Sequence, residues 1–332
     1  MTTETLAAYS LLAVYSAAAV YVLAFVAYVL ELSRRTSETL AAQPGAASVS
    51  APVLNRSTAS AVNGGTAVLV PPAPPRAASA APQPGRAARV AFALTVLGFV
   101  IHVAALVLRG VAAARAPWAN MFEFAITGTA VMVGVYLVVT IFRNVRFVGA
   151  YVTGLVALLL MLASLNVYVD VVPLPPPLQS GWLIVHVFVA ILGTGFFSLG
   201  AGLSIAQLLQ ARREATGSDT PRFLRHFPGS EALENIAYRV NVIGFAFWTF
   251  TLIAGAIWAE HAWGRYWGWD TKEVWTFIIW VVYAGYIHAR ATRGWRGNPS
   301  AWLAIVGFGS VMFNFTVVNL FFKGMHSYSG LD

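Results

Sequence analysis

The chain has 332 residues, of which 58% are hydrophobic and only 10% are charged, whereas soluble globular proteins carry about 25% charged residues. This composition excludes a soluble globular protein and indicates an integral membrane protein. The net charge of +8 therefore informs on loop topology rather than on nucleic-acid binding. The chain contains no cysteine, which excludes disulfides, a thiolate nucleophile and a cysteine-ligated metal within it, so any thiol chemistry must belong to a partner.

Eight apolar stretches of roughly twenty residues are candidates for membrane-spanning helices. They are residues 9–30, 90–108, 122–141, 147–164, 182–209, 236–258, 274–288 and 301–322. We therefore predict an all-α polytopic membrane protein with about eight transmembrane helices. The first stretch lacks the basic start and the A-x-A exit of a signal peptide, so residues 1–32 are predicted to be a retained anchor helix.

The segment between the first two stretches has a different composition. Residues 33–89 are rich in Ala, Pro, Ser and Gly and contain almost no aromatic residues, so they cannot bury enough apolar surface to fold. We predict a disordered cytoplasmic linker there and a single membrane domain over residues 90–332.

Arginines in alternate loops predict the orientation of the helices, because basic loops stay on the cytoplasmic side. They are Arg34, Arg35, Arg56, Arg76, Arg86, Arg143, Arg146, Arg212, Arg213, Arg222, Arg225, Arg290, Arg293 and Arg296. The complementary loops contain Asp170 with a run of prolines, and a tryptophan-rich segment. Both termini are therefore predicted to face outward. Arg109 and Arg115 are two exceptions on the outer side, too few to reverse the count.

Five of the six histidines lie in or beside predicted spans, where an ionisable residue is costly and often functional. They are His102, His186, His261, His288 and His326. A histidine satisfied within the core or at the interface is the plain alternative for each. His186 and His326 are both expected at the outer face, whereas His226 lies in an arginine-rich loop and is given no role.

Residues 261–275 form a dense aromatic segment with charged residues and glycines among the rings. It contains Trp263, Arg265, Tyr266, Trp267, Trp269, Asp270 and Trp275. An ordinary interfacial aromatic belt is the alternative, but belts are usually more dilute. The glycines would let a large flat ligand approach the backbone, so we interpret the segment as a binding platform rather than a catalytic triad.

The donor types favour haem iron over other metals. Two neutral imidazoles beside an aromatic platform suit haem, whereas zinc usually has more protein ligands. Arg265, Arg109 and Arg115 are outer cations that could pair with haem propionates through charge-assisted hydrogen bonds.

The segment from Trp263 to Trp275 resembles the tryptophan-rich WWD signature of the haem-handling proteins of cytochrome c biogenesis. Four flanking motifs, at residues 117–123, 178–186, 286–290 and 324–328, resemble the CcsA (ResC) branch in particular. The resemblance runs from about Arg109 to the C-terminus. It departs at Thr271, where proline often follows the aspartate. The first motif adds Asn120 and Glu123 as candidate haem-binding residues.

The resemblance implies one subunit of a System II cytochrome c synthase in the bacterial plasma (inner) membrane. Such a subunit binds haem b, delivers it to the outer face and, with a CcsB/ResB-like partner, attaches it to the Cys-x-x-Cys-His thiols of apocytochrome c. A thioredoxin-like protein would keep those thiols reduced. By the same resemblance, His186 and His326 are outer haem ligands and His288 is a haem ligand within the membrane.

Three other functions are weighed against this one. A non-catalytic haem exporter or chaperone of the CcmC type would share the WWD segment, but the flanking motifs favour CcsA. A quinol-oxidising b-type subunit would need histidine pairs at matching depths, and His288 has no such partner in this chain. A solute transporter would show inverted repeats and broken spans, which the sequence lacks.

Overall fold

The computed structural model describes residues 2–41, 85–217 and 222–326, and all regular secondary structure in these ranges is helical. The long helices are α1 (Thr3–Ala41), α2 (Arg86–Ala113), α3 (Met121–Phe142), α4 (Gly149–Asn166), α5 (Gly181–Thr216), α6 (Ser230–Trp263), α7 (Thr271–Ala291) and α8 (Asn298–Phe313). After α8, a π-helical turn, η5 (Asn314–Val318), leads into the short α9 (Asn319–Phe321). Shorter 3-10 turns are η1 (Arg146–Val148), η2 (Pro176–Leu178), η3 (Arg222–His226) and η4 (Arg293–Trp295).

Seven helices in the described ranges are long and apolar enough to cross a membrane, which confirms an all-α polytopic membrane protein. The seventh predicted stretch, residues 274–288, does form a helix, α7, but α7 is not among these seven. Lys272 and Glu273 at its start, and His288 and Arg290 at its end, lower its hydropathy. The predicted total of eight spans therefore stays a prediction.

The boundaries of the predicted linker differ from the structure. Helix α1 continues to Ala41 and α2 already begins at Arg86, so residues 33–41 and 86–89 are helical. The apolar pattern ends earlier than the helices because polar residues can extend a helix beyond its apolar face. The rest of the predicted linker, residues 42–84, lies outside the described residues.

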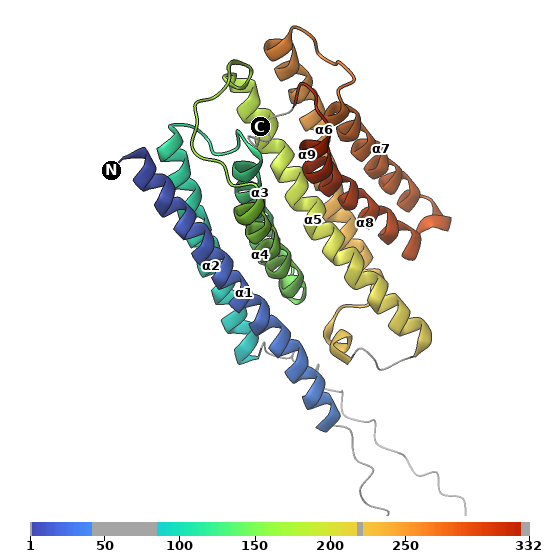
Figure 1. Cartoon of the computed structure of the whole chain (residues 1–332). Helices are drawn as coiled ribbons and strands as arrows, with labels where there is room; N and C mark the ends of the chain where they lie inside the picture. The colour runs from blue at the N-terminus through green and yellow to red at the C-terminus, as the bar shows by residue number, and fades with distance from the viewer. Residues whose placement is uncertain (1, 42–84, 218–221, 327–332) are drawn as a thin grey trace, which may run out of the picture.

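Helix α5 lies between two groups of helices (Figure 1). On one side α1 and α2 pack against each other and against α3 and α4, and on the other side α6, α7 and α8 form the second group. Helix α5 itself contacts α3, α6 and α8. It is therefore placed to carry a side chain into a space that both groups enclose.

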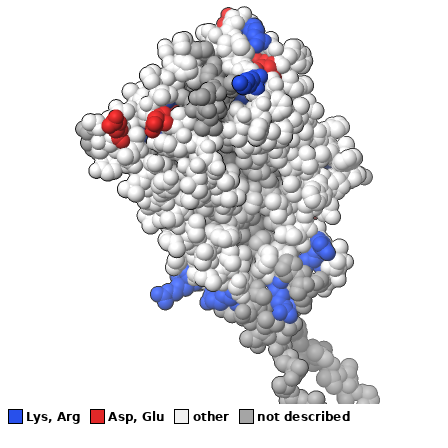
Figure 2. Space-filling view, viewed as in Figure 1, with Lys and Arg blue, Asp and Glu red and all other residues white. Residues whose placement is uncertain are grey.

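The two ends of the bundle differ in charge (Figure 2). On the visible face, Asp and Glu lie toward one end, which also carries some Lys and Arg, whereas the opposite end carries Lys and Arg without Asp or Glu. The end with Asp and Glu also has the N-terminus of α1 and the loop between α6 and α7 (Figure 1). We call it the tryptophan-rich end, after residues 263–269 at the junction of α6 and α7.

Candidate functional site

A cavity of about 520 Å³ opens at the tryptophan-rich end, a size typical of small-molecule sites. Helices α3 to α8, the turn η5 and the segment between α6 and α7 all contribute to its wall. Most of the lining is apolar, and the polar and aromatic lining residues include Trp118, Asn120, His186, Trp248, Thr251, Trp258, Tyr266, Trp267, Lys272, Glu273, Thr276, Asn314, Asn319 and His326.

His186 enters the cavity from the second turn of α5. Its Nδ1 lies 3.0 Å from the Thr251 carbonyl oxygen of α6, and its ring stacks on Trp258 with centroids 5.7 Å apart. A Cβ atom at Gly255 would lie 2.7 Å from the imidazole, so this glycine makes room for the ring. Because a carbonyl oxygen can only accept, Nδ1 carries the proton and Nε2 keeps its lone pair for a metal.

His326, the last described residue, contacts the same Trp258 indole as His186. Its centroid lies 5.5 Å from that of Trp258 and 4.7 Å from that of Trp263. Its Nδ1 lies 3.1 Å from Asp270 Oδ1. In the neutral ring this Nδ1 donates to the carboxylate and leaves the Nε2 lone pair for a metal, which is the usual orienting arrangement of metal-binding histidines.

Asp270 joins the histidine to the start of α7. Its Oδ1 accepts from the Lys272 backbone N–H at 2.9 Å and its Oδ2 from the Met325 N–H at 2.7 Å. The hydrogen bond from His326 contributes most to holding the pKa of the Asp270 carboxyl well below its usual range, although partial burial acts in the opposite direction. A Cβ atom at Gly324 would lie 2.2 Å from Asp270 Oδ2, so glycine is required for this approach.

Glu273 completes a capping box at the same helix start. Its Oε2 accepts from the backbone N–H groups of Gly268 and Asp270, at 2.8 and 3.0 Å, and thereby folds the segment before α7 back onto the helix. Trp269 adopts a φ of +59° there, a rare conformation for a bulky residue that the two hydrogen bonds around it enforce. The segment's conformation is therefore fixed by Glu273.

The predicted platform is only partly brought to the cavity. Tyr266 and Trp267 line it, whereas Trp269 is 75% exposed and meets Trp267 edge-on at 6.0 Å. The Trp263 ring contacts the His326 ring edge-on, and Trp275 packs on Phe313 with ring centroids 4.3 Å apart. Trp258, the buried indole that both histidines contact, was not predicted from the sequence. The sequence feature that could have identified it is its place in the last two turns of α6, at the same end as the other aromatic residues.

Two of the candidate histidines lie away from the cavity. His102 is completely buried on α2, where its ring meets Tyr21 of α1 edge-on at 6.0 Å. His102 thus has the position of a core histidine away from the cavity, and the haem contact expected for it stays a prediction. His261 is exposed, and its Nδ1 contacts the Ile257 carbonyl oxygen at 2.9 Å and the Glu260 carboxylate at 3.2 Å. It does not line the cavity.

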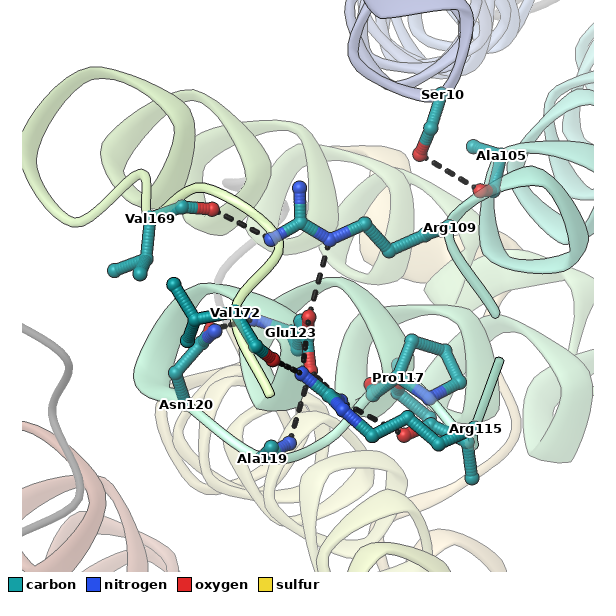
Figure 3. Close-up of polar contacts among 12 residues, drawn as sticks. Ser10, Ala105, Arg109, Arg115, Pro117, Ala119, Asn120, Glu123, Val169 and Val172 are labelled. Atoms are coloured by element: carbon teal, nitrogen blue, oxygen red, sulfur yellow. Dashed lines mark hydrogen bonds and ion pairs between the residues drawn. The ribbon is translucent and has the colours of Figure 1, made fainter. Parts of the chain in front are cut away.

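The predicted propionate-binding arginines do not line the cavity either. Arg109 and Arg115 both pair with Glu123, which is fully buried, and Figure 3 shows the two guanidinium groups converging on this carboxylate. The guanidinium of Arg265 packs over Gly268. Arg109 and Arg115 thus form ion pairs inside the protein with a common partner that the sequence did not reveal, and their contact with haem propionates stays a prediction.

Asn120 and Glu123, from the same motif, thus lie in different surroundings. Asn120 lines the cavity and also caps α3, since its Oδ1 accepts from the Glu123 backbone N–H at 2.9 Å. Glu123 faces the arginines instead. His288 lies near the opposite end of α7 from Asp270, and its side chain is exposed.

The donor set fits a large ligand of mainly apolar character. Within the described ranges, no three His, Asp or Glu side chains come together as a metal site would require, so a site made by protein ligands alone, such as zinc, is not favoured. Two imidazoles on one indole inside an apolar cavity suit haem iron. Glu273 Oε1 and Asn314 Oδ1 are buried acceptors in the lining without a hydrogen-bond partner, positions where a ligand or water would be satisfied.

Comparison with known proteins places this geometry in a family. Residues 118–326 match the family described as Cytochrome C assembly protein, and they contain the whole cavity. The chain belongs to this family. It is of the CcsA type, because it is 34% identical over 253 residues to the cytochrome c biogenesis protein CcsA of Trieres chinensis, covering 68% of this chain and 81% of that one. CcsA of Guillardia theta is 32% identical over 262 residues, covering 73% and 86%.

A solved structure shares the fold. The cytochrome c haem lyase CcmF superposes with a TM-score of 0.59 at 18% identity, over 95% of this CcsA-type chain and 47% of CcmF. The chain thus spans about half the length of that protein. Together these findings establish a multi-pass membrane protein of cytochrome c biogenesis.

Proposed function

We propose that this CcsA-type chain binds haem b in the cavity and, with a CcsB/ResB-like subunit, attaches it to apocytochrome c on the outer face of the membrane. The observation that carries the proposal is the convergence of His186 and His326 on Trp258. These histidines lie far apart in the matched region, residues 118–326, yet both line one cavity and both keep Nε2 available.

Haem is the substrate here, and its vinyl groups are the sites that the apocytochrome thiols attack. Each addition forms an S–C and a C–H bond while an S–H bond and the vinyl π bond break, so no electrons are gained or lost overall. The two histidines would hold the iron, and Trp258, Tyr266 and Trp267 would restrict the tilt of the porphyrin. Holding the vinyls near the thiols is then the main catalytic contribution.

The partners supply what this chain lacks. Apocytochrome c brings the thiols, a thioredoxin-like protein keeps them reduced, and the CcsB-like subunit completes a second haem site. We place the protein in the bacterial plasma membrane with the cavity facing outward.

The outer site is tested by His186→Ala and His326→Ala, each expressed with the partner and an apocytochrome. Both variants should insert normally but yield little or no covalent holocytochrome c, because each removes an axial ligand. Added imidazole should restore part of the activity by entering the vacated position. His261→Ala is the matched control, since it removes an exposed imidazole at the same end and should change nothing.

The same assay separates synthesis from export. Normal maturation in both histidine variants would refute the outer site. Haem bound by wild type without covalent attachment in the presence of partner and thiols would instead favour an exporter of the CcmC type.

The second site rests on His288. From Asp270 to His288 the chain descends about 27 Å along α7 at 1.5 Å per residue, so this exposed histidine cannot share an iron with His186 or His326. Buried His102 is also unavailable. A histidine of the partner would therefore supply the other ligand.

We expect haem at the second site only when the chain is purified with its partner, and we expect His288→Ala to abolish it. The measurement is the haem-to-protein ratio of the complex and of the isolated chain, in a His186→Ala, His326→Ala background that empties the outer site. Haem retained by the isolated chain in that background would contradict a shared site.

A further inference from the structure

Haem carries two propionate carboxylates, and an apolar cavity needs a cation to receive them. None of Arg109, Arg115 and Arg265 lines the cavity. Among the described residues that do, Lys272 is the only lysine or arginine. It stands in the first turn of α7, where the helix dipole also favours an anionic ligand.

Neighbouring residues hold the Lys272 side chain without neutralising it. Its Nζ donates to Asn319 Oδ1 of α9, a neutral acceptor that also lines the cavity. No ion pair of Lys272 occurs within the described part of the chain. The nearby carboxylates have other partners, since Asp270 accepts from His326 and Met325, and Glu273 Oε2 accepts from two backbone N–H groups.

Asn319 is itself fixed in place. Its Nδ2 donates to the Phe315 carbonyl oxygen at 2.8 Å, across the π-helical turn that ends α8. Such turns widen a helix by one residue and occur often at functional sites. The amide oxygen is thereby directed to Lys272, so an ammonium group with further N–H donors is held at the edge of the cavity.

We infer that Lys272, positioned by Asn319, is the subsite for a haem propionate carboxylate. This inference rests on the proposed function, namely that haem occupies the cavity. The propionates lie on one edge of the porphyrin and the vinyls on the opposite edge. A contact between Lys272 and a propionate therefore turns the vinyl edge of the porphyrin away from the start of α7. This contact determines where the vinyls lie for attachment.

The test compares two probes, haem b and its dimethyl ester, which has the same iron, vinyls and ring but no carboxylates. Both are titrated into the purified wild-type complex in detergent, and binding is followed by the haem absorption spectrum. Wild type should bind haem b at least about tenfold more tightly than the ester, as expected for a hydrogen bond between charged groups. Lys272→Met should lose this preference because its affinity for haem b falls to that for the ester.

Two further variants sharpen the result. Asn319→Asp keeps Lys272 but pairs it with a carboxylate, so it should also remove the preference, and it serves if Lys272→Met is not produced in folded form. Arg265→Met removes a cation of the same segment that does not line the cavity, and it should keep the wild-type preference.

The outcomes distinguish the two claims. Equal preference in wild type and Lys272→Met, with haem still bound through histidine, overturns the assignment of Lys272 and leaves the proposed function standing. A wild-type complex that binds neither probe through His186 and His326 refutes the proposed function, and the Lys272 assignment falls with it.

Discussion

His326 and Asp270 show how one hydrogen bond can prepare a ligand. The carboxylate orients the imidazole through Nδ1 and also accepts from two backbone N–H groups, so the ring direction depends on the fold of the segment before α7. His186 has only a backbone carbonyl as its partner. The two histidines are therefore oriented by acceptors of different charge, and a carboxylate makes the imidazole the stronger donor to iron.

Asp270→Asn should lower haem retention at the outer site by about 10- to 100-fold, the usual effect of losing such an orienting partner. The amide keeps the size of the side chain and an oxygen to cap α7, so the variant should still fold. The measurement is the dissociation rate of haem from the purified complex into a haem-scavenging protein. Glu260→Gln, at the exposed carboxylate beside His261, is the control, and a wild-type rate in Asp270→Asn would exclude a role for the charge.

At the residue scale, the sequence predicted which end of the bundle a residue occupies better than it predicted which side chains contact one another. The two outer histidines and part of the aromatic segment do line a cavity, because their position at the ends of apolar stretches determined which end of the bundle they occupy. His102 and the arginines differ, because their partners Tyr21 and Glu123 lie on other helices and nothing in the local pattern pairs them. Trp258 and Lys272 were missed for the same reason.

At the scale of elements, the ion-pair cluster of Arg109, Arg115 and Glu123 connects three parts of the chain. Glu123 belongs to α3, Arg109 lies near the C-terminal end of α2, and Arg115 lies between the two helices. Arg109 also donates to the Val169 carbonyl oxygen and Arg115 to that of Val172, so the cluster holds the segment that leads from α4 to α5 (Figure 3). This segment continues to Leu178, which lines the cavity.

Glu123→Gln should destabilise the protein strongly, by about 3–5 kcal/mol, because it leaves a guanidinium group buried without its counter-charge. Arg109 is only 1% exposed, so water cannot replace the carboxylate. The measurement is the thermal unfolding midpoint in detergent compared with that of Glu260→Gln, an exposed carboxylate. Equal midpoints in the two variants would show that the cluster does not contribute to stability.

Helix positions were predictable because long apolar runs permit few alternatives in a membrane. Helix ends were less so. Residues 33–41 are helical despite their polar composition, and α7 formed where its apolar run was shortest. Hydropathy reports the lipid-facing or core-facing part of a helix, whereas caps such as Asn120 and Asp270 determine where it starts.

At the scale of the whole molecule, one end of the face shown in Figure 2 carries Lys and Arg without Asp or Glu, which agrees with a cytoplasmic position for that end and with the predicted orientation of both termini outside. Reporter fusions test it directly. A fusion after Arg213 and a fusion at the C-terminus should report opposite sides of the membrane, because the first lies at the basic end and the second follows the tryptophan-rich end. Finding both on one side would move the cavity to the wrong face and would remove the basis for attachment outside.

The position of His326 beyond α8 has a consequence for biosynthesis. Helices enter the membrane in the order of the chain, so His186 is in place well before the second proposed ligand has been made. A chain that has been made only up to α6 contains one of the two proposed outer ligands and lacks the part of the cavity wall that α7 and α8 supply. On the proposed function, firm haem capture would therefore wait until the last helices are inserted, and chains that stall during translation would not withdraw a reactive porphyrin from the pool.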